Sequence, residues 1–290
     1  MPKAVRNYDG IELRLTMTHP MHGVSGMFSY TWSSLWGNYT GLTTTDQSDG
    51  GSTGRNSPDT TRSFDEPFYY FGENGKSNNG ALPTDRPNVL KGYVYYTLPS
   101  FKHQTTNIGL VQYGYQGTPL GSYIDVALGQ AGSPIEATYV YGRDKWVDMT
   151  TDASGNITLG QPVTKRTPWF VQSDLNASHT VKVGDHQSIT FEAIALNALN
   201  QRSVTAYNMA MNSWNFGTPL YPGLDSSGNP VSIFDGAEAY KILEGGYHTS
   251  AFINGVPGFA GTNVIKNSLN KQPYLFQNGR SLRLAVRFTF

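Results

Sequence analysis

The clearest pattern in this chain is a strict alternation of apolar and polar residues over its last ten positions, Ser281 to Phe290. Every even position there is apolar: Leu282, Leu284, Val286, Phe288 and Phe290. The odd positions include two arginines, Arg283 and Arg287. Because successive side chains of a strand point to opposite faces, the pattern predicts a strand with one wholly apolar face.

That strand stops on its apolar face with an aromatic residue. A terminal strand that ends in Phe is the signal read by the assembly machinery of outer-membrane β-barrels. We therefore interpret the five apolar residues as a terminal-strand assembly signal. The alternative is an ordinary amphipathic strand of a soluble sheet with one wet face.

A period of two recurs along the chain and predicts six further strands. Their approximate ranges are Tyr8–Thr18, Val24–Trp36, Asn88–Leu98, Thr105–Tyr123, Trp169–Val183 and Ser188–Gln201. In one of them the apolar phase changes from Ile108 and Leu110 to Val111, Tyr113 and Tyr115. A β-bulge near Leu110 would account for this change. The expected fold class is all-β, with about seven antiparallel strands.

The links between these strands alternate strictly between short and long. The short links are His19–Gly23, Pro99–Gln104 and Gly184–Gln187, and the long ones are Thr40–Pro87, Asp125–Pro168 and Arg202–Arg280. Tight turns at one end and long loops at the other are typical of transmembrane β-barrels. We predict a barrel segment in the bacterial outer membrane, in contact with its lipid, with periplasmic turns and long extracellular loops. The last long link holds a helix candidate, Phe234–Asn254.

Aromatic residues gather near the predicted ends of the strands. Amphipathic rings favour the headgroup level of a membrane, so these residues are interpreted as an aromatic girdle. They are Tyr30, Trp32, Trp36, Tyr39, Tyr96 and Trp169. The alternative is the aromatic core of a β-sandwich.

Composition narrows the function classes. The 21 basic and 21 acidic residues give zero net charge, which indicates no nucleic-acid partner. Only 14% of residues are charged and 13% are aromatic, and mean hydropathy is -0.39. The chain has no apolar run of the roughly 20 residues that a membrane-spanning helix needs. This composition also fits a secreted or surface β-sandwich, such as a lectin or an adhesin.

The sequence shows no catalytic grouping, so we expect neither an enzyme nor a cofactor. There is no Cys. His19 and His22 lack a nearby carboxylate, and the acidic stretch Thr45–Asp59 departs from the spacing of a calcium-binding EF-hand loop. Possible ligand contacts are four aromatic residues of a long loop. These are Phe68, Tyr69, Tyr70 and Phe71.

Seven phrases of the chain resemble the Oar-like branch of the TonB-dependent receptors. They are Tyr30–Leu42, Gly54–Asp65, Leu82–Lys91, Tyr115–Leu120, Arg166–Leu175, Asn197–Gln201 and Phe276–Phe290. They occur in family order over most of the chain. Two departures are Ala285, where a Gly is commoner, and the segment Asn197–Gln201, which lacks an aromatic before its second Asn.

The resemblance implies a receptor with an N-terminal regulatory-like domain, a plug and a 22-stranded barrel. Residues 1–290 would be the C-terminal part of that barrel, without the signal peptide, the regulatory-like domain and the plug. The implied function is TonB-dependent passage of a large substrate, such as a saccharide, peptide or chelate, across the outer membrane. The implied partners are the barrel-assembly machinery and, through the absent plug, the TonB complex.

Overall fold

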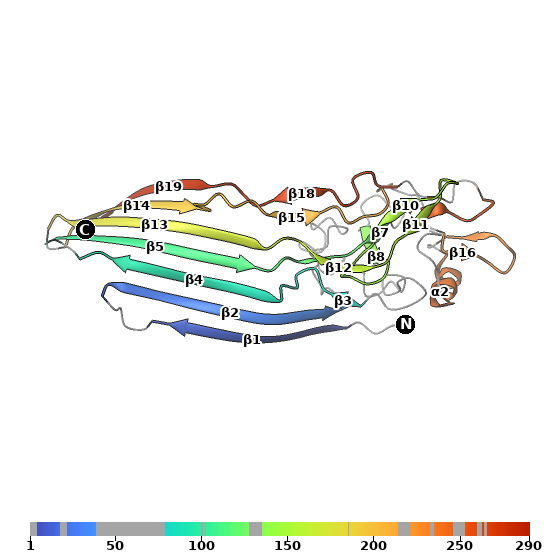
Figure 1. Ribbon diagram of the computed structural model, residues 1–290, viewed down its shortest axis with the longest axis horizontal. Helices are drawn as coiled ribbons and strands as arrows, with labels where there is room; N and C mark the ends of the chain where they lie inside the picture. The colour runs from blue at the N-terminus through green and yellow to red at the C-terminus, as the bar shows by residue number, and fades with distance from the viewer. Residues whose placement is uncertain are drawn as a thin grey trace.

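A computed structural model shows an elongated molecule with a long sheet at one end and folded loops at the other (Figure 1). The structure describes residues 5–17, 22–38, 79–99, 101, 103–127, 135–184, 186–213, 221–232, 235–245, 253–259, 263 and 266–290. The N-terminal end of the chain lies on the loop side, and the C-terminus lies at the far end of the sheet.

Seven long strands form one antiparallel sheet in the order in which they occur in the chain. They are β1 (Arg6–Thr16), β2 (Val24–Gly37), β4 (Asn88–Thr97), β5 (Gln104–Tyr115), β13 (Phe170–Lys182), β14 (Ser188–Leu196) and β19 (Ser281–Thr289). Each long strand pairs with the next one, so β1 and β19 are the edges. The prediction of an all-β fold with seven antiparallel strands is confirmed.

The predicted bulge near Leu110 is wrong. β5 pairs without a register shift with β13 from Gln104 to Tyr115 and with β4 from Asn107 to Tyr115. The apolar phase changes because the two groups of residues face opposite sides of a regular strand. Ile108 and Leu110 lie on one face, and Val111, Tyr113 and Tyr115 lie on the other.

Short strands that the sequence pattern did not predict lie between the long ones, and the strand predicted over Thr105–Tyr123 ends at Tyr115. β3 (Gly80–Ala81) pairs with β2, and β6 (Pro119–Leu120), β9 (Lys145–Trp146) and β12 (Val163–Arg166) form a small sheet. Three hairpins are β7 (Tyr123–Ala127) with β8 (Ile135–Tyr139), β10 (Met149–Thr151) with β11 (Ile157–Leu159), and β16 (Gly223–Leu224) with β17 (Pro230–Val231). In addition, β15 (Val204–Tyr207) pairs with β18 (Pro273–Phe276), which lies far from it in the sequence.

The helix candidate is present in shortened form as α2 (Gly236–Gly245). Its Ala239 is buried, and Ile242 lies against Gly223 of β16. Ala237 is exposed, so it does not belong to the packed face of the helix. Among the described residues, no helix is long and apolar enough to cross a membrane.

The buried apolar core lies among the loops rather than in the long sheet. Leu35 is the one residue of the seven long strands among the buried hydrophobics of the described chain. The largest fully buried side chains all belong to the loop end: Leu82, Leu120, Tyr123, Ile124, Val140 and Met211. The long strands therefore do not serve as one half of a conventional protein core.

A buried ion pair joins the loops to the rim of the sheet. Asp85 is 3% exposed at its side chain and pairs with Arg166 at 2.5 Å. The other oxygen of this carboxylate accepts the Leu35 backbone N–H at 2.7 Å. Arg166 also donates to the carbonyl oxygens of Asp85 and Gly117, both at 3.1 Å. One carboxylate thus joins β2, the link before β4 and the end of β12.

A second group of polar contacts, centred on Asn197, holds the opposite part of the rim. Asn197 follows β14 with a φ of 50° and is 2% exposed. Its backbone N–H donates to Asp174 of β13 at 2.7 Å, and its side-chain amide donates to the carbonyl oxygens of Gln201 and Asn278. The link after β14 and the segment before β19 are therefore held against β13.

Replacing Asp85 with Ala is expected to destabilise the protein by about 3–5 kcal/mol, because it leaves the Arg166 guanidinium buried without its carboxylate. The measurement is urea-induced unfolding, followed by Trp fluorescence in detergent. Glu238→Ala is the control, since its pair with Lys241 is exposed and worth about 0–1 kcal/mol. Equal, small losses in both variants would contradict the role assigned to the buried pair.

Candidate functional site

One face of the long sheet is apolar from its first strand to its last, and we call it the apolar face. The strand register places the even positions of β2, β4, β5 and β19 on it together with the odd positions of β1, β13 and β14. Its larger members are Ile11, Leu13, Leu15, Phe28, Tyr30, Trp32, Trp36, Leu90, Val94, Tyr96, Ile108, Leu110, Val171, Leu175, Phe191, Leu282, Leu284, Val286 and Phe288.

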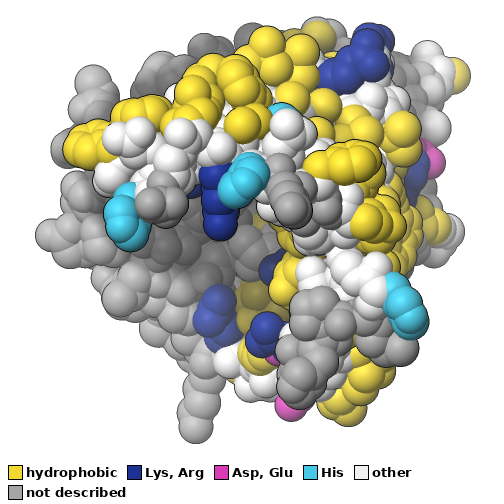
Figure 2. All heavy atoms as spheres, turned by 90° about the vertical axis from the view of Figure 1, so that its left-hand side faces the viewer, with side chains coloured by type: hydrophobic (Ala, Val, Ile, Leu, Met, Phe, Trp, Pro, Cys, Tyr) yellow, Lys and Arg dark blue, Asp and Glu magenta, His cyan; other side chains and the backbone are white. Residues whose placement is uncertain are grey.

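The apolar face is open to its surroundings. Most of these side chains are exposed, from 36% at Val171 to 75% at Leu284, whereas Tyr30 and Leu90 are half-buried. Viewed from the turn end, hydrophobic side chains follow the outer side of an arc, and most of the Lys and Arg side chains in view lie inside it (Figure 2). No second sheet packs on this face among the described residues. An area of this size on a monomer marks a contact with a membrane or a partner.

Aromatic residues occupy both ends of the apolar face. Trp32 and Trp36 lie on β2 toward the loops, and Trp169, 43% exposed, immediately precedes β13 at the same end. Tyr96 lies near the turns, opposite Val24. From Val24 to Trp32 the strand covers about 26 Å at the usual rise per residue. This spacing suits the two interfaces of a membrane, but a girdle role for these residues stays a prediction.

The other predicted residues are placed as follows. The terminal-strand residues Leu282, Leu284, Val286 and Phe288 share the apolar face, and the rings of Phe288 and Phe290 stack at 5.8 Å. Tyr30 lies on the same face and donates its hydroxyl to Asn88 at 2.6 Å. Five predicted site residues lie outside the described part of the chain: Tyr39, Phe68, Tyr69, Tyr70 and Phe71.

The opposite face carries the charges, and we call it the polar face. Nine of the ten charged residues in the seven long strands lie on it, and Asp9 is the exception. The nine are Arg6, Glu12, Arg14, Lys91, Asp174, Lys182, Glu192, Arg283 and Arg287. Side-chain hydrogen bonds cross this face from strand to strand, as between Thr97 and Asn107 at 2.7 Å and between Thr180 and Thr190 at 2.9 Å.

A group of rings also lies on the polar face. Tyr115 of β5 stacks on Phe170 of β13 at 5.8 Å, and the ammonium of Lys91 lies 5.9 Å from the Tyr115 ring. Tyr95 lies over Gly109, where an added Cβ would come within 2.2 Å of the ring. Ring stacking and cation–π contacts therefore place these tyrosines away from the apolar face.

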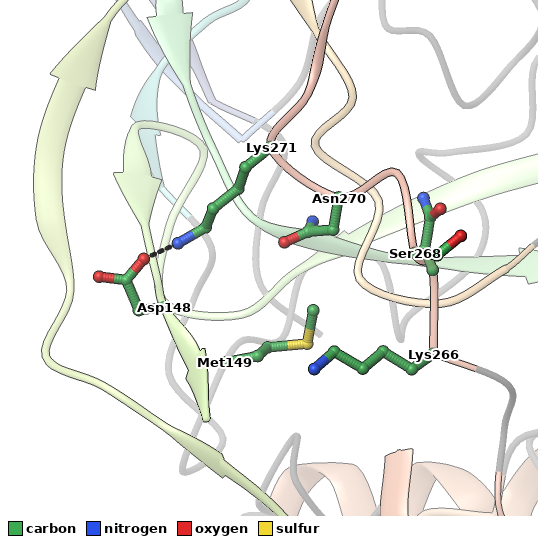
Figure 3. Close-up of a pocket in the computed structure, with 7 residues that line it drawn as sticks. Asp148, Met149, Lys266, Ser268, Asn270 and Lys271 are labelled. Atoms are coloured by element: carbon green, nitrogen blue, oxygen red, sulfur yellow. Dashed lines mark hydrogen bonds and ion pairs between the residues drawn. The ribbon is translucent and has the colours of Figure 1, made fainter. Parts of the chain in front are cut away.

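A pocket of about 480 Å³ lies between two loops at the loop end. Its lining residues are Asp148, Met149, Lys266, Asn267, Ser268, Asn270 and Lys271. Figure 3 shows Lys271 and Asn270 on one side of the pocket, with Met149 and Lys266 on the opposite side. Lys271 and Asp148 form an ion pair across the edge. Sequence reasoning missed this site because its two halves are more than 100 residues apart.

The lysine of this ion pair is held against an aromatic ring. The Lys271 ammonium lies 5.0 Å from the centroid of Trp146, and Lys165 lies at the same distance from that ring. Trp146 is 5% exposed and packs edge-on against Tyr207 at 6.1 Å. Burial lowers the pKa of Lys271 below its ordinary value. The pocket is thus built on a rigid support, with a partly desolvated amine on one wall.

Two exposed hairpins at the loop end share the five-residue pattern Asp-x-Ser-Gly-Asn. The first, Asp152–Asn156, is the tip of the β10–β11 hairpin beside the pocket, and the second, Asp225–Asn229, joins β16 to β17. In both, the Asp carboxylate accepts the backbone N–H groups two and four residues ahead at 2.8–2.9 Å. These bonds, first of all that from Asn156, lower the pKa of Asp152.

The described residues contain no group of three His, Cys, Asp or Glu side chains placed to hold a metal ion. His22 lies in the turn before β2 with a φ of 49°, and His19 lies outside the described residues.

Comparison with known proteins relates the chain to a transporter. It is 25% identical over 289 residues to the TonB-dependent transporter Oar of Myxococcus xanthus, a match that covers 100% of this chain and 23% of the relative. The chain therefore spans about a quarter of the length of that protein. No family model matches the sequence, and no solved structure matches it. The likeness supports a distant relationship to TonB-dependent transporters.

The Asp152 turn should be sensitive to acid. Because the folded-state pKa lies below the unfolded value of about 3.9, the stabilisation is present above that pH and is lost as pH falls through the folded pKa. Hydrogen exchange of the β10–β11 hairpin should therefore speed up in wild type relative to Asp152→Asn as pH falls from about 5 to 3. An identical pH profile in the two proteins would contradict the assignment.

Proposed function

We propose that this chain forms the C-terminal wall and loops of an outer-membrane transporter barrel that works with the TonB complex. The wall contacts lipid through the apolar face, and the polar face lines the interior through which a large substrate, such as a saccharide, peptide or chelate, passes. The loop end faces the outside of the cell. The chain supplies no catalytic step.

The observation that carries this proposal is the exposed apolar face, which spans seven strands and has nine of the ten strand charges on its reverse side. A β-sandwich, the alternative, would bury such a face against a second sheet. A barrel in a membrane needs apolar residues facing outward and polar residues facing inward, alternating along every strand. The distant likeness to a TonB-dependent transporter points to the same class of protein.

Energy coupling and assembly would involve partners of this chain. In such a transporter a plug would couple the barrel to the TonB complex, and the apolar face of β19 would be the surface read by the barrel-assembly machinery. The edges of β1 and β19 each have one unpaired side in the described structure. Because unpaired backbone groups are costly in lipid, we expect both edges to pair with further strands of the same barrel.

Single-Cys variants of the intact protein should report the two faces directly. The chain contains no Cys, so one introduced thiol gives it a single labelling position. A fluorophore at Leu284 or Val286 should be quenched by brominated lipid, because both side chains are on the apolar face. A fluorophore at Arg283 or Arg287, the neighbours on the polar face, should be quenched by aqueous iodide instead.

Shielding of Leu284 and Val286 from both quenchers would mean a dry protein core, and it would favour the sandwich over the barrel. The direction of the loops is tested in the same way. A Cys at Ser227, in the exposed turn between β16 and β17, should react on intact cells with a maleimide that cannot cross membranes. Protection of that Cys until the cells are lysed would contradict outward-facing loops.

A matched pair of Val→Arg variants tests the membrane contact energetically. Val94 is on the apolar face, opposite Leu110, whereas Val111 is on the polar face, opposite Tyr93. Arg at Val94 should cost about 2–4 kcal/mol if that site is near the midplane of the membrane. The amount of assembled protein in the outer membrane should therefore fall in Val94→Arg.

Val111→Arg is the control, since it puts the same charge at the same level of the sheet but on its other face. It should assemble at nearly the wild-type level. An equal loss in the two variants would mean that the sheet has no lipid-facing side.

A further inference from the structure

We propose that the loop pocket binds the carboxylate group of a small hydrophilic ligand between Lys266 and Lys271. The inference starts from the charges of the lining. The pocket contains two ammonium groups and one carboxylate, so its lining carries a net charge of +1. Lys271 is paired with Asp148, and Lys266 has no ion-pair partner among the described residues. An incoming anion would therefore find one free amine on the wall opposite Lys271.

The ion pair already in the pocket shows how an anion would be held. Asp148 is 75% exposed at its side chain, whereas Lys271 is only 23% exposed and lies over Trp146. The lysine is thus the fixed partner, and the aspartate reaches it from the solvent side. A ligand carboxylate could take the place of Asp148 and gain Lys266 as a second donor.

The loop that carries both lysines is held in place by its asparagines. Asn267 and Asn270 donate their side-chain amides to the carbonyl oxygen of Ala210 at 3.0 and 2.8 Å. The backbone N–H of Lys271 donates to the Asn208 carbonyl at 2.7 Å. These bonds hold the backbone of the loop that carries Lys266 and Lys271 before any ligand arrives, which reduces the entropic cost of binding.

Size and polarity limit the ligand. A volume of about 480 Å³ lies in the usual range of small-molecule sites. Apart from Met149, the lining side chains are polar or charged, which suits a hydrophilic molecule. Two sources offer such a carboxylate: an acidic sugar and the C-terminus of a short peptide. Both belong to the substrate classes of the proposed transporter, so the inference rests on the proposed function for its biological setting.

The test is isothermal titration calorimetry on the detergent-solubilised intact protein with three probes. Galacturonate represents an acidic sugar, acetyl-diglycine represents a peptide carboxylate, and glucose is the neutral control. We expect saturable binding of at least one carboxylate probe, weakening with added salt, and none of glucose. The stronger of the two carboxylate probes identifies the source.

Variants then locate the site. Lys266→Gln and Lys271→Gln should each weaken binding about tenfold, since a charge-assisted hydrogen bond is lost. Lys165→Gln is the matched control, because Lys165 lies 5.0 Å from the same Trp146 ring but does not line the pocket. It should leave the affinity unchanged. Asp148→Asn should strengthen binding, because it frees Lys271 from its internal partner.

The gain in Asp148→Asn is the decisive result, because loss of structure cannot produce it. Binding of glucose as tight as that of the acids, no binding of either acid, or weaker binding in Asp148→Asn would overturn the carboxylate site. These outcomes are independent of the lipid-quenching result, since binding is measured in detergent. A failure of the barrel proposal and a failure of this one are therefore distinguishable.

Discussion

The structure depends on an apolar sheet face that no described part of the protein covers. At about 25 cal/mol per Å² of apolar surface, a face of seven strands would be strongly unfavourable in water. The chain has a buried core, but that core lies among the loops. Side chains of the sheet such as Leu284 and Val94 stay exposed. The hydrocarbon environment that we propose for this face would remove the cost. In that environment the sheet would need no protein core, whereas the loops are stabilised by their own buried core.

The same constraint explains the connectivity. In lipid, each backbone N–H and C=O of a strand must find its partner in a neighbouring strand. Strands joined by tight turns satisfy this with adjacent segments of chain, and the seven long strands pair in sequence order. In the proposed barrel the long links lie in water outside the membrane, where they form hairpins and a core of their own. The rim between the two regions is closed by polar groups, with Asp85 between β2 and Arg166.

The sequence reveals the sheet well and the loops poorly, and the reason is physical. A strand with one apolar and one polar face must alternate, so the period of two in Ser281–Phe290 or Val24–Trp36 is sufficient to find it. In β5 the alternation was present but led to a wrong prediction of a bulge. Tyr113 and Tyr115 were assumed to lie on the apolar face, and they lie on the polar face. The pocket has no such period. Asp148 and Lys271 come together only when the loops fold, and their separation in the sequence does not predict the contact.

Four of the family-like phrases lie wholly or partly at the rim: Leu82–Lys91, Tyr115–Leu120, Arg166–Leu175 and Asn197–Gln201. A fifth, Phe276–Phe290, runs along the whole of β19. A strand of the long sheet needs an apolar residue at every second position, and the pattern leaves the identity of that residue open. The rim needs particular groups, since a buried carboxylate must meet a guanidinium and a left-handed turn favours Asn. Gly117 is another such position, because a side chain there would clash with the Thr167 carbonyl oxygen.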